Sequence, residues 1–170
     1  MRSVFVSTTI GEYIKRDHDD FRLMFECLWN SSTREAGLRK EVYPFLVNRI
    51  ISHHVAEATT IFPLMEKNPE LLPITLVLIE EHRGMAMLAR DLGELPYEDR
   101  LWRPRIFPFY DVISAHWIKE ETDVFPHAPF YFSGKDLTGI GEKFQEILHR
   151  EWKIKGVHAG VPAVMFKRGG

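Results

Sequence analysis

Apolar residues recur along most of this chain every three or four positions, which is the spacing of one face of an α-helix and not the alternation typical of a strand. Prolines and glycines divide the pattern into four long helical segments and a shorter fifth. We expect helices over residues 9–30, 41–67, 73–92, 102–127 and 136–152. Short connections between long helices favour antiparallel neighbours. The pattern therefore predicts an all-α fold, an antiparallel up-down-up-down four-helix bundle with a short additional C-terminal helix.

Several helix ends carry local signals. Thr9 and Glu12 have the spacing of a capping box, which would open the first helix. Pro44 is predicted to lie in the first turn of the second helix, where its missing N–H costs little. Pro63 and Pro126 are expected to kink or end the second and fourth helices.

The length and composition fit one ordinary globular domain. The chain has 170 residues, of which 45% are hydrophobic and 27% are charged. We expect one domain over residues 1–153, in which the fifth helix forms a lid over one end of the bundle. Residues 154–170 are rich in glycine and small residues and are expected to form a loosely ordered tail.

Charge and hydropathy exclude several classes of protein. A net charge of −2 gives no reason to expect a nucleic-acid partner, because such proteins usually carry a basic surface. No apolar run reaches the roughly 20 residues of a membrane span, and the N-terminal MRSVFVSTT lacks the pattern of a secretory signal. Cys27 has no second cysteine to pair with, which fits a reducing compartment. We expect a cytoplasmic protein without a membrane or nucleic-acid partner, and the sequence leaves homo-oligomerisation open.

Four histidines and two glutamates interrupt the apolar stripes of the four long helices: His18, His53, Glu57, His82, His116 and Glu120. The second and fourth helices carry a matching element, SHHVAEATTIFP and SAHWIKEETDVFP, in which a Glu follows a His by four residues and a Phe-Pro pair comes next. A helix rises 1.5 Å per residue, so each HxxxE pair places its imidazole and carboxylate about 6 Å apart on one face. Both groups can reach the same small ion.

The energetic cost of burying these six groups separates two readings. A single histidine on an apolar face is more often a hydrogen-bonded core residue than a metal ligand. Six unpaired buried polar groups would cost on the order of 10 kcal/mol, which is comparable to the net stability of a domain, about 5–15 kcal/mol. Mutual hydrogen bonding could offset this cost, but two cations would neutralise both carboxylates and use all four imidazole lone pairs. We therefore predict a metal site.

The ligand types narrow the choice of metal. Imidazole and carboxylate suit iron, manganese or zinc, and there is no set of thiolates for a structural zinc site. Four imidazoles and two carboxylates suit two ions and leave positions open for a small exogenous molecule. A single ion would be saturated by six ligands. Ferritin-like sites use a Glu-x-x-His step of three, whereas the step here runs from His to Glu and spans four.

The two HxxxE elements followed by Phe-Pro, together with Asp-His at position 18 and Glu-Glu-His at position 82, resemble the hemerythrin family, specifically its HHE-domain branch. The similarity covers residues 9–127. The resemblance implies a non-heme site with two iron ions joined by an oxo or hydroxo group. It also implies that His82 and His116 share one iron, that His18 and His53 share the other, and that the glutamates, Glu57 and Glu120, bridge them.

One position departs from the family pattern. Oxygen-carrying hemerythrins have a second histidine one turn beyond the third-helix histidine, and here that residue is Ala86. This departure weighs against reversible oxygen carriage. The resemblance implies a protein that binds or senses dioxygen or a related small molecule, such as a diatomic or peroxide ligand. The alternatives are an enzyme acting on peroxide or nitric oxide with the same irons, an iron-handling protein, and a metal-free helical interaction module. Manganese and zinc remain alternatives to iron.

Residues beside the six also carry expectations. His54 points about 100° around the helix from His53, so we expect it to be exposed or outside the ligand set. Asp17, Glu81 and Glu121 either orient ligands from outside or belong to a solvated face. The dry wall around the site is predicted to consist of Phe21, Phe25, Met85 and Ile113.

Overall fold

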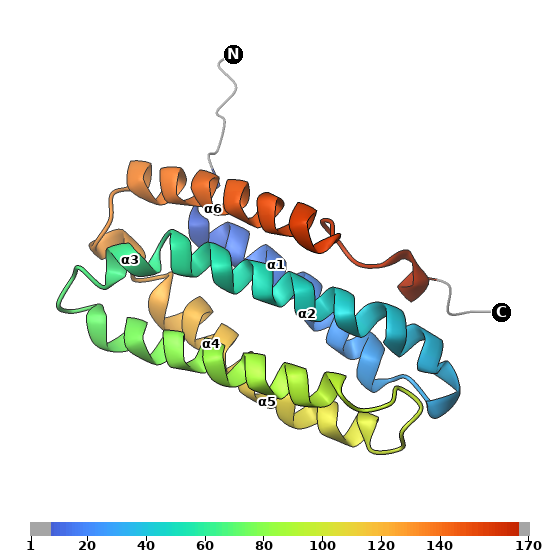
Figure 1. The fold of residues 1–170 in the computed structure, drawn as a ribbon. Helices are drawn as coiled ribbons and strands as arrows, with labels where there is room; N and C mark the ends of the chain where they lie inside the picture. The colour runs from blue at the N-terminus through green and yellow to red at the C-terminus, as the bar shows by residue number, and fades with distance from the viewer. Residues whose placement is uncertain (1–7, 167–170) are drawn as a thin grey trace, which may run out of the picture.

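The computed structural model describes residues 8–166, and every regular element within them is helical. Neighbouring helices in the chain pack side by side and close into a four-membered ring, as Figure 1 shows. The predicted four-helix bundle is confirmed: its helices are α1 (Ile10–Trp29), α2 (Ala36–Thr59), α4 (Leu72–Gly93) and α5 (Trp102–Lys119). The first seven residues, which include most of the segment considered for a signal, and the last four residues of the predicted tail lie outside the described part.

The ends of α1 and α2 test the local signals. The capping box between Thr9 and Glu12 is confirmed at the start of α1. The second helix begins earlier than expected, at Ala36, after a second capping box formed by Ser32 and Glu35. Pro44 therefore lies inside α2 and not in its first turn. The proline is exposed, so its ring lies on the outer side of the helix, away from the packed interior.

Both helices that carry an HxxxE element are distorted just after the glutamate. The helix α2 ends at Thr59, and a short helix, α3 (Phe62–Met65), follows with Pro63 in its first turn. The hydroxyls of Thr59 and Thr60 donate to carbonyls four residues back, which competes with helix continuation. After α5 the chain makes a wider π-turn over Glu120–Val124, closed by the N–H of Phe125 on the carbonyl of Glu120. Such turns often occur where a helix must redirect a functional side chain.

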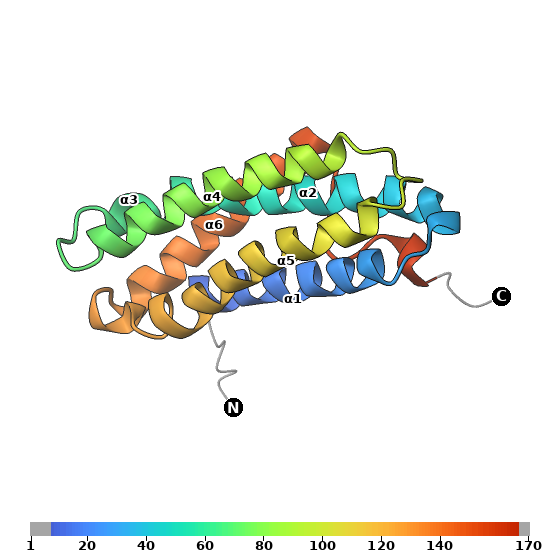
Figure 2. The ribbon, with the colours of Figure 1, turned by 90° about the horizontal axis from the view of Figure 1, so that it is seen from below.

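The predicted additional C-terminal helix is α6 (Gly134–Lys155). It lies along α1 and α2 instead of over one end of the bundle, on the side away from α4 and α5 (Figures 1 and 2). Its apolar stripe runs the length of the helix and is buried throughout: Leu137, Ile140, Phe144, Ile147, Leu148 and Trp152. A stripe that long needs a partner of equal length, which only the side of the bundle provides.

A glycine lets α6 approach the start of α1. A Cβ atom at Gly141 would lie 2.9 Å from the backbone nitrogen of Ile10 and 3.1 Å from the ring of Tyr13. Any larger residue would have to push the two helices apart, because one of these neighbours is backbone. Gly141 therefore fixes the close contact that seats α6 against the bundle.

The described part of the tail also packs on the bundle, although we expected it to be loosely ordered. Arg49, which is buried in α2, donates to the carbonyl of Gly160 at 2.6 Å and to Asp17 of α1 at 2.9 Å. Val161 and Val164 pack against the core. One buried guanidinium therefore ties α1, α2 and the residues after α6 together. Within residues 8–166, none of the helices has the length and apolar character that crossing a bilayer demands.

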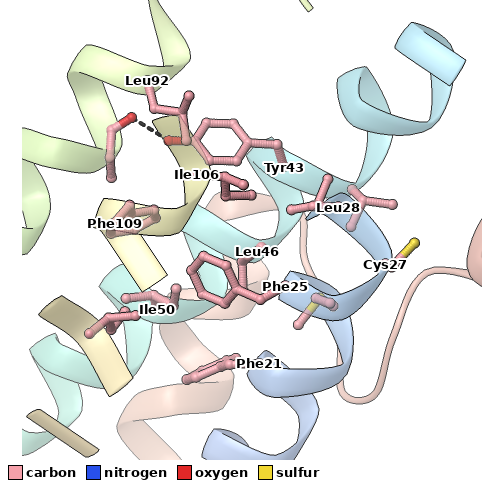
Figure 3. Close-up of a cluster of buried hydrophobic side chains, with 14 of the residues drawn as sticks. Phe21, Phe25, Cys27, Leu28, Tyr43, Leu46, Ile50, Leu92, Ile106 and Phe109 are labelled. Carbon is pink, nitrogen blue, oxygen red and sulfur yellow. Dashed lines mark hydrogen bonds between the residues drawn. The ribbon is translucent and has the colours of Figure 1, made fainter. Parts of the chain in front are cut away.

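The interior contains two apolar clusters with a polar layer between them. The first, here the Phe25 cluster, fills the half of the bundle near the α1–α2 and α4–α5 connections, and Figure 3 shows part of it. It includes all four residues predicted to form the dry wall: Phe21, Phe25, Met85 and Ile113. The second, here the Phe144 cluster, fills the other half and includes the buried stripe of α6.

Each of the four helices runs from one apolar cluster to the other, and its polar site residues lie between the two. In α1, Ile14 belongs to the Phe144 cluster, Phe21 belongs to the Phe25 cluster, and His18 lies between them. The other three helices, with the turns that directly follow α2 and α5, also have one residue of each cluster on either side of their histidines and glutamates. These flanking residues are Ile50 and Ile61, Leu78 and Met85, and Ile113 and Val124. The predicted site residues therefore share one level of the bundle, enclosed above and below by apolar side chains.

Candidate metal centre

All six predicted site residues meet in this layer. Five of them are no more than 1% exposed, and the side chain of the sixth, His82, is 11% exposed. Charged and polar side chains are rarely buried to this extent unless they are paired or bind a metal. Other interactions must therefore compensate these imidazoles and carboxylates for the hydration that they lose on burial.

The four histidines form two pairs, each with its Nε2 atoms turned toward one another. The first histidine pair joins α1 and α2, and its Nε2 atoms, on His18 and His53, are 3.3 Å apart. The second histidine pair joins α4 and α5, and its Nε2 atoms, on His82 and His116, are 3.1 Å apart. Each pair thus presents two nitrogens to one small volume.

Each glutamate divides its two oxygens between the pairs. The Oε1 of Glu57 lies 3.4 Å from His53, and its Oε2 lies 3.4 Å from His82. The Oε2 of Glu120 lies 3.4 Å from His18, and its Oε1 lies 3.2 Å from His116. Two similar compartments result, and each holds two imidazole nitrogens and one oxygen from each carboxylate.

Three carboxylates outside this layer contact the Nδ1 atoms of three of the histidines, on the side of each ring opposite Nε2. The Nδ1 of His53 lies 3.0 Å from Asp17, that of His18 lies 2.9 Å from Glu121, and that of His116 lies 2.8 Å from Glu81. Each carboxylate is adjacent in sequence to a site residue but contacts a histidine on a neighbouring chain segment. Of the two readings left open by the sequence, the orienting role fits this geometry better than a solvated face.

Each outer carboxylate is in turn paired with a cation. Arg49 contacts Asp17 at 2.9 Å, Arg22 contacts Glu121 at 2.8 Å, and Lys119 contacts Glu81. The same series of contacts, from a cation to a carboxylate to an imidazole, therefore occurs three times around the site. Each carboxylate thus has a cation on one side and an imidazole nitrogen on the other, and a carboxylate anion accepts hydrogen bonds and does not donate them.

This arrangement determines where the imidazole protons lie. The Nδ1 of His18 and that of His53 must each donate to a carboxylate, so in the neutral rings both Nε2 atoms carry a lone pair. Two lone pairs 3.3 Å apart repel unless a cation lies between them or near them. A proton can play that part in the absence of metal, and a metal ion can replace it.

The pKa values of the histidines agree with this picture. Burial lowers the pKa of His18 well below its ordinary value, and burial together with His116 lowers that of His82 to about 3. Burial also opposes charge on His53 and His116, but the glutamate one turn along the helix outweighs it, and the pKa of each rises to about 10. Each pair therefore contains one imidazolium and one neutral imidazole when no metal is bound.

The two glutamates differ in the same way. Burial and repulsion by Glu120 raise the pKa of Glu57 to about 7. Burial also opposes charge on Glu120, but His116 outweighs it and lowers the pKa to about 2. The cluster thus retains protons at neutral pH that a divalent cation would displace.

The glutamate oxygens provide the clearest test of whether a metal fits. All four carboxylate oxygens of Glu57 and Glu120 are buried and have no hydrogen-bond partner among the described residues, because the neighbouring nitrogens lie near them without hydrogen-bond alignment. Unpaired buried carboxylate oxygens are costly, and cations remove that cost. Metal ions in the two compartments would use every one of these oxygens.

The comparisons with known proteins agree with the geometry. The model of the hemerythrin HHE cation-binding domain matches residues 9–128, which is most of the chain. The chain belongs to this hemerythrin family. Neither the comparison with curated proteins nor the comparison with solved structures finds a match. The family makes this a cation-binding domain, and two groups of its His and Glu side chains are close enough together to hold metal ions.

Of the two alternatives expected for His54, exposure to solvent is wrong, and a place outside the ligand set stays a prediction. His54 is only 9% exposed, and it lies with Glu57, His82 and His116 in one of the two groups whose ligand atoms are all within 4.8 Å of one another. The turn of about 100° from His53 does not carry it to solvent, because α2 borders both α1 and α4. His53 faces α1, and His54 faces α4.

The outer carboxylates of this hemerythrin domain are expected to set its metal affinity. Replacing Asp17 by Asn should weaken metal binding about 10- to 100-fold, since the amide no longer fixes the proton on Nδ1 of His53. Asp91→Asn is the matched control, because the Asp91 carboxylate is exposed near the end of α4 and pairs with Arg90. Metal titration against a competing chelator measures the metal affinity of both variants. Equal affinities in the two variants would show that Asp17 does not orient the histidine.

Proposed function

We propose that this hemerythrin domain holds two iron ions, one in each compartment, with six protein ligands. The first histidine pair would bind one ion, the second pair would bind the other, and Glu57 and Glu120 would bridge them. The observation that supports this best is the division of each buried carboxylate between the two pairs, with one oxygen toward each. A single ion could not use both ends of both carboxylates.

Iron is the metal that we propose on chemical grounds. Imidazole and carboxylate ligands suit iron, manganese and zinc alike. Iron is favoured because the hemerythrin resemblance implies iron and because a site with unfilled positions suits binding of a redox-active molecule. When bound, two ferrous ions would supply the electrons and the open positions needed to bind dioxygen or a related small molecule.

The residues around the site support binding or sensing of such a molecule. His18 stacks on Trp117 with ring centroids 5.1 Å apart, and Phe21 contacts both His18 and His53. These rings exclude water from the compartments, which protects a reduced metal from side reactions. A pocket of about 300 Å³ between α2 and α4 reaches His54 and His82 from outside and is large enough for a diatomic molecule.

Oxygen titration after anaerobic loading with ferrous iron tests this function. We expect a change in visible absorption when oxygen is added and the return of the first spectrum when oxygen is removed. Sustained consumption of peroxide or nitric oxide by the same loaded protein would favour the enzymatic alternative. Loading of fewer than two irons per chain would contradict the proposed site itself.

Metal binding is expected to release protons. His53 and His116 have pKa values of about 10 in the folded protein, against about 6.5 in an unfolded chain. Near pH 8 both are protonated and Glu57 is mostly ionised, so loading should release about two protons per chain. An indicator dye in weak buffer measures the release during addition of ferrous iron. Loading without proton release would contradict the assigned charges.

The same shifts give the metal-free protein a defined pH dependence. Between pH 6.5 and 10 the folded state binds more protons than the unfolded state at these two histidines, so its free energy of unfolding falls as pH rises. Bound metal replaces the protons and removes this loss. Thermal unfolding at pH 7 and pH 9 should therefore show a stabilisation by metal that grows with pH.

A further inference from the structure

His54 has the position and the unused nitrogen of an additional ligand. It follows His53 in α2 and faces the second histidine pair, His82 and His116, where its ring stacks on that of His82 at 3.7 Å. Its Nε2 is buried and has no hydrogen-bond partner among the described residues. An unpartnered imidazole nitrogen this close to other donor atoms points to a missing cation.

We propose that His54 is a third imidazole ligand of the metal held by the second histidine pair. This inference rests on the proposed two-metal site. It is supported by the grouping of His54 with Glu57, His82 and His116, whose ligand atoms all lie within 4.8 Å of one another. The neighbouring residue on α4, Ala86, offers no donor atom, so α2 provides the nitrogen that α4 does not.

Ligation requires the ring of His54 to turn. Its plane is now only 10° from that of His82, and two imidazoles that point at the same ion cannot lie stacked in parallel. Rotation about the Cβ–Cγ bond would turn Nε2 toward the ion. The pocket of about 300 Å³ beside the ring, lined by Ala58, Ile79 and Ala86 among others, gives the ring room to move.

A third imidazole would make the two metal positions unequal. The ion at the second pair would be held by three imidazoles and two carboxylate oxygens. The ion at the first pair would have two imidazoles and two carboxylate oxygens. Fewer protein ligands would therefore hold the ion at His18 and His53 than the ion at the second pair.

Two substitutions separate ligation from stacking. His54→Phe keeps an aromatic ring on His82 but has no nitrogen, and His54→Ala removes both. We expect each variant to bind one of its two irons on the order of 100-fold more weakly than the unchanged protein, measured by titration against a competing chelator. His127→Ala is the control, since His127 is exposed and bonds to the carbonyl of Asp123. It should bind as the unchanged protein does.

The outcomes distinguish this inference from the proposed function. Unchanged affinity in His54→Phe, with two irons bound, would overturn the ligand role and leave the two-metal site intact. Failure of the unchanged protein to bind two irons would overturn both. X-ray absorption of the loaded protein gives an answer even if the variants do not fold. Five imidazoles over two irons are expected, and four would contradict the proposal.

Discussion

Replacing Glu57 by Gln is expected to abolish binding of at least one of the two proposed metal ions. Each oxygen of Glu57 faces a different histidine pair, and a neutral amide can neither bridge two cations nor neutralise them. The affinity for metal should fall at least 100-fold, which exceeds the effect expected at the outer carboxylates. Metal content after dialysis, with chelator titration, measures the loss.

The same substitution separates metal binding from packing. Glu57 already has a pKa raised to about 7, so an uncharged Gln of similar shape should change the stability of the metal-free protein little. Glu57→Ala should lose metal and should also destabilise the bundle by leaving a cavity in the layer. Glu26→Gln, at an exposed position of α1, is the matched control. Retention of two ions by the Gln variant would contradict the bridging role.

Removal of the metal is expected to lower the melting temperature by about 8–16 °C. A ligand present at 1,000 times its dissociation constant stabilises the folded state by about 4 kcal/mol, and one kcal/mol shifts the melting temperature of a domain this size by about 2–4 °C. The residues that would lose the cation are buried between apolar clusters, so little water is available to compensate their polar atoms.

Calorimetry of the loaded protein, with and without a chelator, measures this shift. Returning ferrous iron to the chelated sample should restore the melting temperature, which excludes irreversible damage. A melting temperature that does not depend on metal would mean that the buried imidazoles and carboxylates compensate one another without a cation.

Much of the bundle follows from local physics. The stripes of apolar residues at helical spacing give the four long helices, and short connections leave little choice but antiparallel neighbours. An apolar stripe that contains His18 or His82 turns that histidine inward together with the apolar residues. The sequence could therefore predict that the histidines and glutamates of the four helices come together in the interior.

The features that differed from expectation depend on contacts between distant segments. The apolar stripe of α6 shows that one face is buried but not that α1 and α2 cover it. The end of α2 at Thr59 depends on threonine hydroxyls that compete with the helix, in addition to Pro63. Pro44 was placed in a first turn because the start of α2 was expected too late.

The surroundings of the site were the hardest to read from sequence. Asp17, Glu81 and Glu121 lie beside site residues in the chain, yet each contacts a histidine of another segment. His54 lies one residue from His53 and faces a different neighbour. Adjacency along a helix therefore says little about which partner a side chain meets, because the packing of the ring decides it.

Anomalous diffraction at the iron edge, from crystals of the protein loaded anaerobically with ferrous iron, tests the central claim most directly. Two peaks are expected in each chain, one beside His18 and His53 and one beside His82 and His116, with Glu57 and Glu120 between them. A single peak, or peaks elsewhere in the bundle, would contradict it.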